Sequence, residues 1–264
     1  MSALIEIPAP IATYLHGDFE PARLIGQKGL QTISVCIPAR DEEATIGEIV
    51  SSVHRDLVEP LGLVDELVVI DDGSRDRTAA VAAEAGAQVL GGPGLGKGEA
   101  MALARGRGDI VVFLDGDVRN FSSHFVTGLL GPLLTCEETV LVKGCYARPA
   151  LDGSRGGGRV TELVAKPLVA LLFPELSAIR QPLAGETAVR AHLLDELELD
   201  GGYGVEMGLL IDASRRYGTG ALAQVDLGAR LHRNRPLDEL APEARQVISS
   251  VLRRVGDVGL HLVG

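Results

Sequence analysis

Short apolar runs alternate with amphipathic segments through the first half of the chain. Each run is long enough for a buried strand and ends near glycine, proline or acidic residues. The runs predict strands at 33–38, 67–70, 87–90 and 109–114. The segments between them predict helices that open at 41–46 and cover 76–84 and 99–107. Strands and helices that alternate over short connections indicate a mostly parallel α/β sheet with right-handed crossovers.

The second half of the chain is less regular. Apolar runs predict strands at 140–144 and 221–227. Helices are predicted after the glycine-rich residues 156–158 as far as about 172, after 202–206 as far as about 216, and over 237–254. Residues 1–30 have weak periodicity and predict an N-terminal arm, packed on the body or on a partner. No linker separates the halves, so we expect one globular unit.

Composition and charge narrow the class of protein. Apolar residues make up 46% of the 264 residues, and with only 3% aromatics the core must be mostly aliphatic, which suits strands covered by helices. A formal net charge of −11 argues against nucleic acid or a membrane surface as a general partner. The absence of a bilayer-spanning apolar run and of a signal pattern predicts a cytoplasmic protein. Cys36, Cys136 and Cys145 have no metal-ligand spacing and are expected to be thiols, buried at Cys36 and Cys145.

Two acidic residues follow the predicted strand at 109–114. Asp115 and Asp117 flank Gly116, and two carboxylates at the end of a buried strand need a counter-charge. A hard divalent cation, Mg²⁺ or Mn²⁺, takes oxygen ligands and would neutralise the charge that builds on a departing nucleoside diphosphate. Taken alone, the motif is more typical of a plain polar turn.

More polar residues are expected at the same edge, because ligands of parallel α/β sheets bind at the carboxyl ends of the strands. Residues 38–42 end the first strand and can form one wall of a base pocket. Asp72 follows the second strand, where its carboxylate can accept from a base N–H or a ribose hydroxyl. Lys97 lies in the glycine-rich segment 91–98 at the start of a predicted helix. A cation is unfavourable there for the helix dipole, and a shared anionic ligand would remove the conflict.

A second anion site is predicted in the second half. A glycine-rich turn at 156–161 leads into a helix, and its backbone N–H groups, a guanidinium and a hydroxyl can bind a phosphate. After the strand at 221–227, alternation would place Arg230, His232 and Asn234 on one face. A neutral histidine there can complete a metal site together with Asp117.

The order of these segments resembles the glucosyl-3-phosphoglycerate synthase family of retaining GT-A glycosyltransferases. The resemblance runs from Ile33 to about Arg254. It is carried by GKGEA at 96–100, GRVTELVA at 158–165, QPLAGE at 181–186, GYGVE at 202–206 and HRNRPL at 232–237. The resemblance implies a GT-A, Rossmann-like α/β fold. It divides the chain into an arm at 1–30, a nucleotide-sugar-binding half at 31–146 and an acceptor-binding half at 147–264.

The resemblance also implies roles for individual residues. The donor nucleotide would be bound by Pro38, Ala39, Glu42, Asp72, Lys97, Asp115 and Gly116. The metal would be bound by Asp117 and His232. The 3-phosphoglycerate acceptor would be bound by Gly158, Arg159, Val160, Thr161, Arg230 and Asn234. Catalysis would rest on Asp117, Lys97 and Glu206, of which Glu206 positions the reacting groups. The family also tends to form homodimers.

The implied reaction moves glucose from a nucleoside diphosphate sugar to the 2-hydroxyl of 3-phosphoglycerate. Asp72 and Gly116 stand where the family often has serine, and a carboxylate at 72 can accept from guanine as well as from uracil. The donor base therefore stays open, and mannosyl transfer from GDP-mannose is the nearest alternative. Transfer to a lipid phosphate, a sugar nucleotidyltransferase and a non-catalytic sugar-nucleotide binder are more distant ones.

Overall fold

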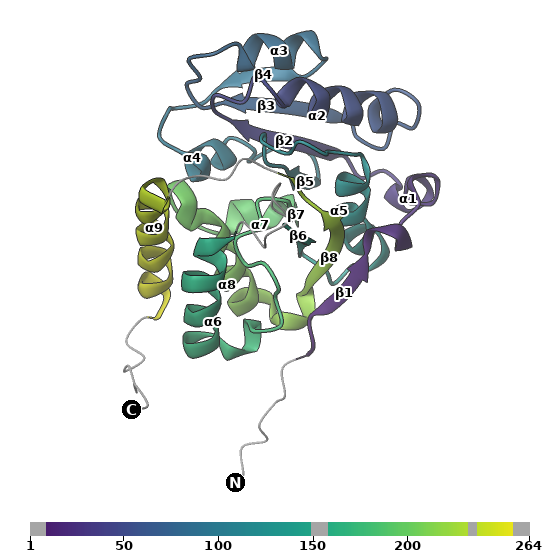
Figure 1. Cartoon of the computed structure of the whole chain (residues 1–264). Helices are drawn as coiled ribbons and strands as arrows, with labels where there is room; N and C mark the ends of the chain where they lie inside the picture. The colour runs from purple at the N-terminus through teal and green to yellow at the C-terminus, as the bar shows by residue number, and fades with distance from the viewer. Residues whose placement is uncertain (1–8, 149–157, 232–236, 256–264) are drawn as a thin grey trace.

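The computed structural model describes residues 9–148, 158–231 and 237–255, and its centre is an eight-stranded sheet. The strand order is β1-β8-β6-β7-β5-β2-β3-β4 (Figure 1). The strands are β1 (Ala12–Leu15), β2 (Ile33–Ala39), β3 (Glu66–Asp71), β4 (Gln88–Gly91), β5 (Ile110–Phe113), β6 (Leu141–Ala147), β7 (Thr187–Arg190) and β8 (Leu222–Ala229). All neighbouring pairs are parallel except those of β7, which runs antiparallel to both β5 and β6.

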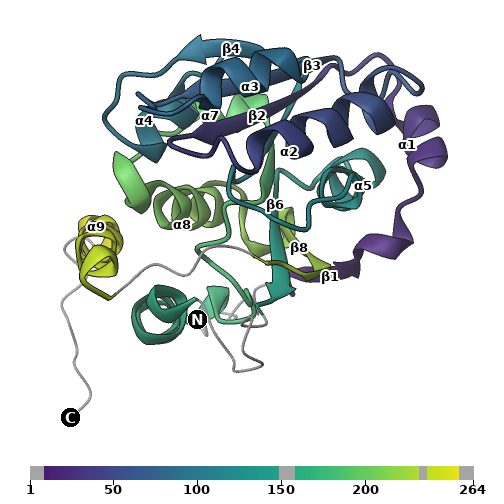
Figure 2. The same cartoon turned by 45° about the horizontal axis from the view of Figure 1, so that its top comes forward.

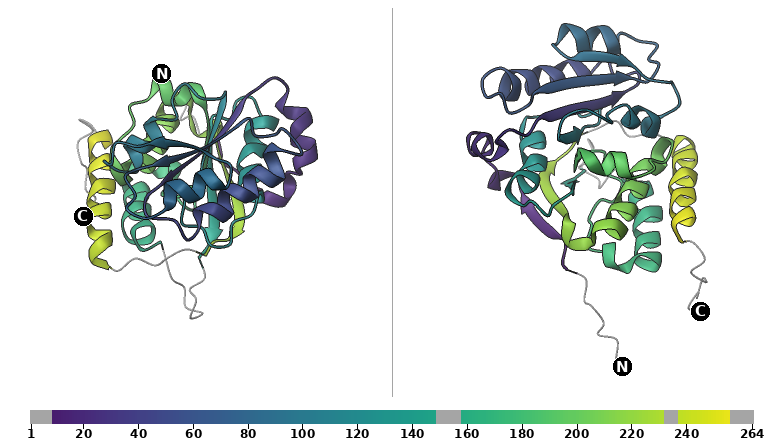
Figure 3. Two further views of the ribbon diagram at one scale, coloured as in Figure 1. Left: turned by 90° about the horizontal axis from the view of Figure 1, so that it is seen from above. Right: turned by 180° about the vertical axis from the view of Figure 1, so that it is seen from behind.

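Helices cover both faces of the sheet, and Figure 2 shows α2 lying across β2. One face is covered by α1 (Pro21–Lys28), α2 (Ile46–Val53), η2 (His54–Val58), α3 (Thr78–Glu84) and α5 (His124–Thr135). The other is covered by α4 (Lys97–Ala102), α6 (Lys166–Leu172), α7 (Ala191–Glu196), α8 (Val205–Tyr217) and α9 (Leu237–Val255). Short helical turns complete the described chain: η1 (His16–Asp18), η3 (Thr161–Ala165), η4 (Pro174–Leu176), η5 (Gly202–Gly204) and η6 (Thr219–Ala221). Figure 3 shows α6, α8 and α9 grouped at one end of the molecule.

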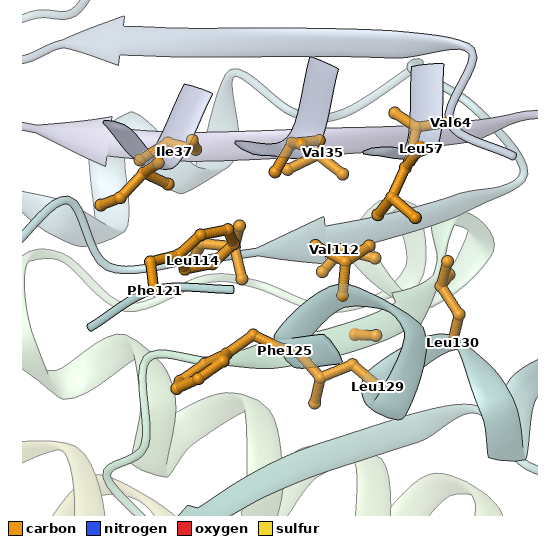
Figure 4. Packing of buried hydrophobic residues seen from close by; sticks show 14 of the residues in the cluster. Val35, Ile37, Leu57, Val64, Val112, Leu114, Phe121, Phe125, Leu129 and Leu130 are labelled. Atoms are coloured by element: carbon orange, nitrogen blue, oxygen red, sulfur yellow. The ribbon is translucent and has the colours of Figure 1, made fainter. Parts of the chain in front are cut away.

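Alternation along the central strands divides the core into two layers. On β2, Val35 and Ile37 point to the α2 and α5 side, while Cys36 points to the opposite layer. On β5, Val112 joins the first layer and Phe113 the second. Figure 4 shows the first layer, in which the side chains of the strands pack against those of η2 and α5. Strands buried on both faces place their polar residues at the ends, and the site lies there.

Helices and strands agree with the predicted α/β sheet, but two strands were missed. β1 comes from the segment predicted to be an arm, and it pairs in parallel with β8 at the sheet edge. β7 has only four residues, between a turn and the start of α7, too few to show a period. No helix within the described residues is long and apolar enough to cross a membrane.

The start of the helix predicted to open at 41–46 was wrong. The helix begins at Ile46, and Asp41 has a φ of 55°, in the left-handed region. Asp41 Oδ1 accepts from the backbone N–H of Arg75 at 2.7 Å, and Glu43 Oε2 accepts from that of Arg77 at 2.9 Å. These acids therefore join the β2–α2 loop to the β3–α3 loop. The helix predicted at 99–107 covers 97–102 instead.

Candidate active site

A cavity of about 320 Å³ lies at the carboxyl ends of β2, β3 and β5. Its other walls come from α4, the helix start at 158–161, α8 and α9. Of the residues predicted to bind substrates or metal, it is lined by Pro38, Ala39, Glu42, Asp72, Lys97, Asp115, Gly116, Asp117, Gly158, Arg159, Val160, Thr161, Glu206 and Arg230. The other two, His232 and Asn234, lie outside the described residues. Residues from both halves of the sequence thus meet in one cavity.

Lys97 lies at the first position of α4 and is held by two carboxylates. Its Nζ is 2.5 Å from Asp115 Oδ1 and 2.8 Å from Glu206 Oε1. Burial alone would lower the pKa of Lys97, but the two carboxylates hold that pKa well above its ordinary value. The unfavourable placement at a helix N-terminus is therefore compensated by acidic residues of the protein itself. The backbone of Gly96 has a φ of 127°, which favours glycine and allows the turn into the helix.

Arg230 links the two acids that follow β5. Its Nη2 donates to Asp115 Oδ2 at 2.8 Å and to Asp117 Oδ1 at 2.6 Å. Burial opposes ionisation of Asp115, but the charges of Lys97 and Arg230 outweigh it and hold the pKa of Asp115 well below its ordinary value. Asp115 is therefore ionised and fixed by a cation on each oxygen.

A fully buried carboxylate lies behind Arg230. Glu186 Oε1 is 3.0 Å from Arg230 Nε, and Tyr146 Oη donates to Glu186 Oε2 at 2.7 Å. Burial raises the pKa of Glu186, although the Arg230 charge opposes this shift. Arg230 Nη1 also donates to Tyr146 Oη at 3.3 Å. Glu186 and Tyr146 thus hold the Nε and Nη1 atoms of Arg230, while its Nη2 donates to Asp115 and Asp117.

The turn 184–187 forms the floor under Asp115. The buried Lys143 on β6 donates from Nζ to Ala184 O at 2.6 Å and to Thr187 Oγ1 at 2.9 Å. Burial lowers the pKa of Lys143 to about 8. Gly185 presses against Asp115: an added Cβ would lie 2.5 Å from Asp115 Oδ2 and closer still to its other carboxyl atoms. Only glycine fits at this position with Asp115 in place.

The β2 and β3 ends form the opposite wall, where the base was predicted to bind. Asp72 is only 5% exposed, and its carboxylate accepts from the backbone N–H groups of Gly94 and Gly96. Thr45 Oγ1 donates to Gly116 O at 2.6 Å, which ties the turn between the two acids to the start of α2. The polar groups of this wall are therefore largely fixed by the protein.

The part of the cavity that is predicted to bind the acceptor is lined by two arginines, Arg148 and Arg159, near the helix start at 158–161. Arg148 Nη2 donates to Tyr146 Oη at 3.2 Å, and its guanidinium lies over the Tyr146 ring at 5.1 Å from the centroid. Arg159 follows Gly158, whose φ of 71° permits the turn into the helix. Thr161 begins η3, a π-helical turn that continues into α6. Together with Arg230, Arg148 and Arg159 bring three guanidinium groups to the side that is predicted to bind the acceptor, in a chain of negative net charge.

The described residues fit a divalent cation. Asp117 contributes a carboxylate to the cavity wall, whereas both oxygens of Asp115 are held by Lys97 and Arg230. No cluster of three or more histidine, cysteine or acidic residues with metal-binding geometry occurs in 9–148, 158–231 or 237–255. Mg²⁺ commonly binds through one or two carboxylates, with substrate phosphates and waters filling its remaining positions. The carboxylate of Asp117, beside the predicted nucleotide site, meets that pattern.

Comparison with known proteins agrees with this arrangement. A family model, Glycosyl transferase family 2, matches residues 34–155. The glucosyl-3-phosphoglycerate synthase of Mycolicibacterium smegmatis is 48% identical over 259 residues, which are 91% of this chain and 84% of that protein. The chain belongs to the glucosyl-3-phosphoglycerate synthase family.

Solved structures of the same family show the same fold. The Mycobacterium tuberculosis glucosyl-3-phosphoglycerate synthase in complex with Mn²⁺, UDP-glucose and phosphoglyceric acid matches with a TM-score of 0.85 and 47% identity, over 93% of this chain and 88% of that chain. The complex of that enzyme with Mn²⁺, UDP and glucosyl-3-phosphoglycerate matches with a TM-score of 0.86 and 48% identity, over 94% and 88%. The predicted GT-A fold is confirmed.

Sequence reasoning missed several residues of the site in this family member. Glu186 and Gly185 belong to the QPLAGE motif, which was used for the resemblance but received no role. Tyr146 lies near the end of β6 and Arg148 directly follows that strand, in a segment without a recognisable motif. Residues of α9 also line the cavity, although an amphipathic helix near the end of a chain suggests only packing. The sequence signal that could have indicated a role in the site was Glu186, an acidic residue that follows the two small residues Ala184 and Gly185.

Proposed function

We propose that the chain transfers glucose from UDP-glucose to the 2-hydroxyl of 3-phosphoglycerate, with retention of the anomeric configuration. The observation that carries the proposal is the single cavity, which joins the strand-end acids and Lys97 to the basic helix start at 158–161. Such a site has room for a donor diphosphate beside a small anionic acceptor. A relative that is 48% identical to this chain is named glucosyl-3-phosphoglycerate synthase, and the enzyme of that name from Mycobacterium tuberculosis was crystallised with UDP-glucose and phosphoglyceric acid.

On the donor side, Pro38, Ala39 and Glu42 would wall the base with Asp72. Asp115 would contact the ribose and Gly116 would allow close approach of the nucleotide. Support for this division comes from their position at neighbouring strand ends around one cavity. The firm anchoring of Asp72 and Asp115 favours a preformed donor site.

Asp117 and His232 would hold Mg²⁺ or Mn²⁺. Structures of a related enzyme contain Mn²⁺ or Mg²⁺ together with UDP, which supports a divalent cation. The cation would supply positive charge to the departing diphosphate. Lys97 would add a second charge, since its Nζ already lies among the acids at the cavity floor. Asp115, Asp117 and Glu206 are each paired with a cation of the protein, so we assign none of them as a nucleophile.

The acceptor would bind at the other end of the cavity. Gly158, Arg159, Val160 and Thr161 would hold its phosphate and carboxylate, with Arg230 and Asn234 nearby. Two kinds of donor group, a guanidinium and a hydroxyl, suit a small molecule that carries both a phosphate and a carboxylate. Glu206, at the first turn of α8, would position the sugar or the acceptor hydroxyl.

A donor panel tests the proposal. The full chain is mixed with Mg²⁺ or Mn²⁺ and with UDP-glucose, GDP-glucose or GDP-mannose, each with and without 3-phosphoglycerate, and nucleotide release is followed. We expect the largest acceptor-dependent release from UDP-glucose. Preference for GDP-mannose would favour the mannosyl alternative. If the acceptor accelerates release from no donor, the proposed transfer is wrong.

The homodimer and the cytoplasmic location stay proposals. Buried Cys36 and Cys145, both free thiols, are consistent with a reducing compartment. Light scattering of the purified chain measures its mass in solution, and a mass near twice 27.7 kDa is expected for the dimer.

A further inference from the structure

Asp72 makes contacts that the proposed base-binding role does not require. Its Oδ1 accepts from the backbone N–H of Gly94 at 2.8 Å, and its Oδ2 accepts from that of Gly96 at 2.9 Å. Its own N–H donates to Ala39 O at 2.9 Å, which fixes it to the end of β2. One carboxylate at a strand end thus holds two amides of the segment 92–96, here called the glycine loop.

The glycine loop wraps closely around this carboxylate. A Cβ on Gly92 would lie 3.0 Å from Asp72 Oδ1 and 3.1 Å from its Cα, so the backbone approaches as near as glycine permits. Gly94 and Gly96 have φ values of 72° and 127°. Glycines confer little conformational preference of their own, so such a loop needs an outside contact to stay in one conformation. The two hydrogen bonds to Asp72 supply that contact.

The far end of the glycine loop leads directly to Lys97. Gly96 is the residue before α4, and Lys97 is the first residue of that helix. A Cβ on Gly96 would lie 3.2 Å from the Cα of Gly202, so the loop is confined on its other side as well. Lys97 Nζ then lies 2.5 Å from Asp115 and 2.8 Å from Glu206. Any shift of the loop at Gly96 would move Lys97 relative to these acids.

We propose that Asp72 is a positioning residue, which sets the place of Lys97 through the glycine loop; this rests on the proposed role of Lys97 in transfer. In this chain each carboxylate oxygen of Asp72 accepts from a different amide, because the two amides lie two residues apart. Asparagine keeps the shape of the side chain but turns one oxygen into an NH₂ group, which faces an N–H donor. Serine offers one oxygen on a shorter side chain.

The test compares Asp72→Asn with the full wild-type chain. Exchange of the Gly94 and Gly96 amide hydrogens is measured by NMR without ligands, and steady-state kinetics are measured with UDP-glucose and 3-phosphoglycerate. We expect one of the two amides to exchange about tenfold faster or more, since it loses a hydrogen bond to a charged group. We expect kcat to fall by about tenfold or more, with the KM for 3-phosphoglycerate within about twofold of wild type.

Asp71→Asn is the matched control. It removes a charge one residue away, and the new asparagine side chain keeps the oxygen that accepts from the Ser74 N–H at 3.2 Å in the wild-type chain. Loop exchange and kcat should stay within about twofold of wild type in this variant. If Asp72→Asn is not folded by circular dichroism, Asp72→Ser takes its place with the same two measurements.

Unchanged amide exchange and unchanged kcat in Asp72→Asn, with only the KM for UDP-glucose raised, would overturn the positioning role and leave a base contact. The exchange measurement needs no substrate. If the wild-type chain fails to transfer glucose but Asp72→Asn still releases the loop amides, the anchoring holds and the proposed function is what fails.

Discussion

Gly185→Ala directly tests how the turn 184–187 supports Asp115. The added methyl group would lie 2.5 Å from Asp115 Oδ2 and nearer to the other carboxyl atoms, far inside van der Waals contact. The turn has little freedom to retreat, because Lys143 holds Ala184 O at 2.6 Å and Thr187 Oγ1 at 2.9 Å. Asp115 must therefore be displaced.

The cost follows from the contacts that Asp115 would lose. Its two oxygens accept from Lys97 at 2.5 Å and from Arg230 at 2.8 Å. Hydrogen bonds to charged groups contribute about 1.5–3 kcal/mol each, so losing both costs about 3–6 kcal/mol. The two hydrogen bonds lie within the folded protein, so the free energy of unfolding should fall by about 3–6 kcal/mol. Displacement of Asp115 also misplaces a residue of the proposed donor site, and a misplacement of about 1 Å can cost about 10²-fold, so kcat/KM should fall by about 10²-fold.

The assay is acceptor-dependent UDP release by Gly185→Ala, with urea unfolding to show that the variant is folded. Gly26→Ala is the control, because Gly26 lies exposed in α1 with no atom near its added Cβ, and it should retain full activity. In an Asp115→Ala background, Gly185→Ala should have little further effect. A folded Gly185→Ala variant with kcat/KM within about fivefold of wild type would refute the reasoning.

Three further predictions concern other parts of the molecule. In steady-state kinetics, Thr161→Val should raise the KM for 3-phosphoglycerate by about tenfold or more and leave the KM for UDP-glucose unchanged. A KM for 3-phosphoglycerate equal to that of wild type would contradict the proposed role of Thr161 in acceptor binding. The folded-state pKa of Lys143 is about 8, below its ordinary 10.5, so the unfolded chain binds more protons between these values. We therefore compare the free energies of unfolding of wild type and Lys143→Met by urea titration. The wild-type value minus the variant value should rise by about 3 kcal/mol between about pH 8 and about pH 10.5, and a difference that stays constant with pH would contradict the burial of Lys143. Because burial raises the pKa of Cys36 to about 12 and that of Cys145 also above its ordinary value, only Cys136 should react rapidly with a thiol reagent at neutral pH; three rapid thiols in the native protein would show that the core opens.

The central fold was predictable because its strands are buried on both faces. Val35 and Ile37 on β2 lie in a continuous apolar run, and such runs mark parallel strands without tertiary information. β1 was not predictable, because its four residues are mostly exposed and its strand conformation depends on pairing with β8 more than two hundred residues later. The start of α2 was misplaced, because Asp41 and Glu43 bond to a loop that is distant in sequence.

The site was predictable where motifs lie at strand ends. Asp115 and Asp117 were predicted at a strand end and Lys97 in a glycine-rich loop before a helix, and the structure brings all three together with Glu206 and Arg230 in one cavity. Glu186 could not be assigned from sequence, because its role depends on a contact with Arg230, which is distant in the chain, and burial of a carboxylate leaves no local pattern. The predicted roles of Asp117 and His232 in metal binding stay predictions.

The central claim is tested most directly by identifying the product of the wild-type chain. UDP-glucose, 3-phosphoglycerate and Mg²⁺ or Mn²⁺ are incubated with the enzyme, and the products are analysed by NMR and mass spectrometry. The account predicts one equivalent of glucosyl-3-phosphoglycerate for each UDP released, with glucose on the 2-hydroxyl and the α configuration of the donor retained. Free glucose with unchanged 3-phosphoglycerate, or a product of inverted configuration, would contradict it.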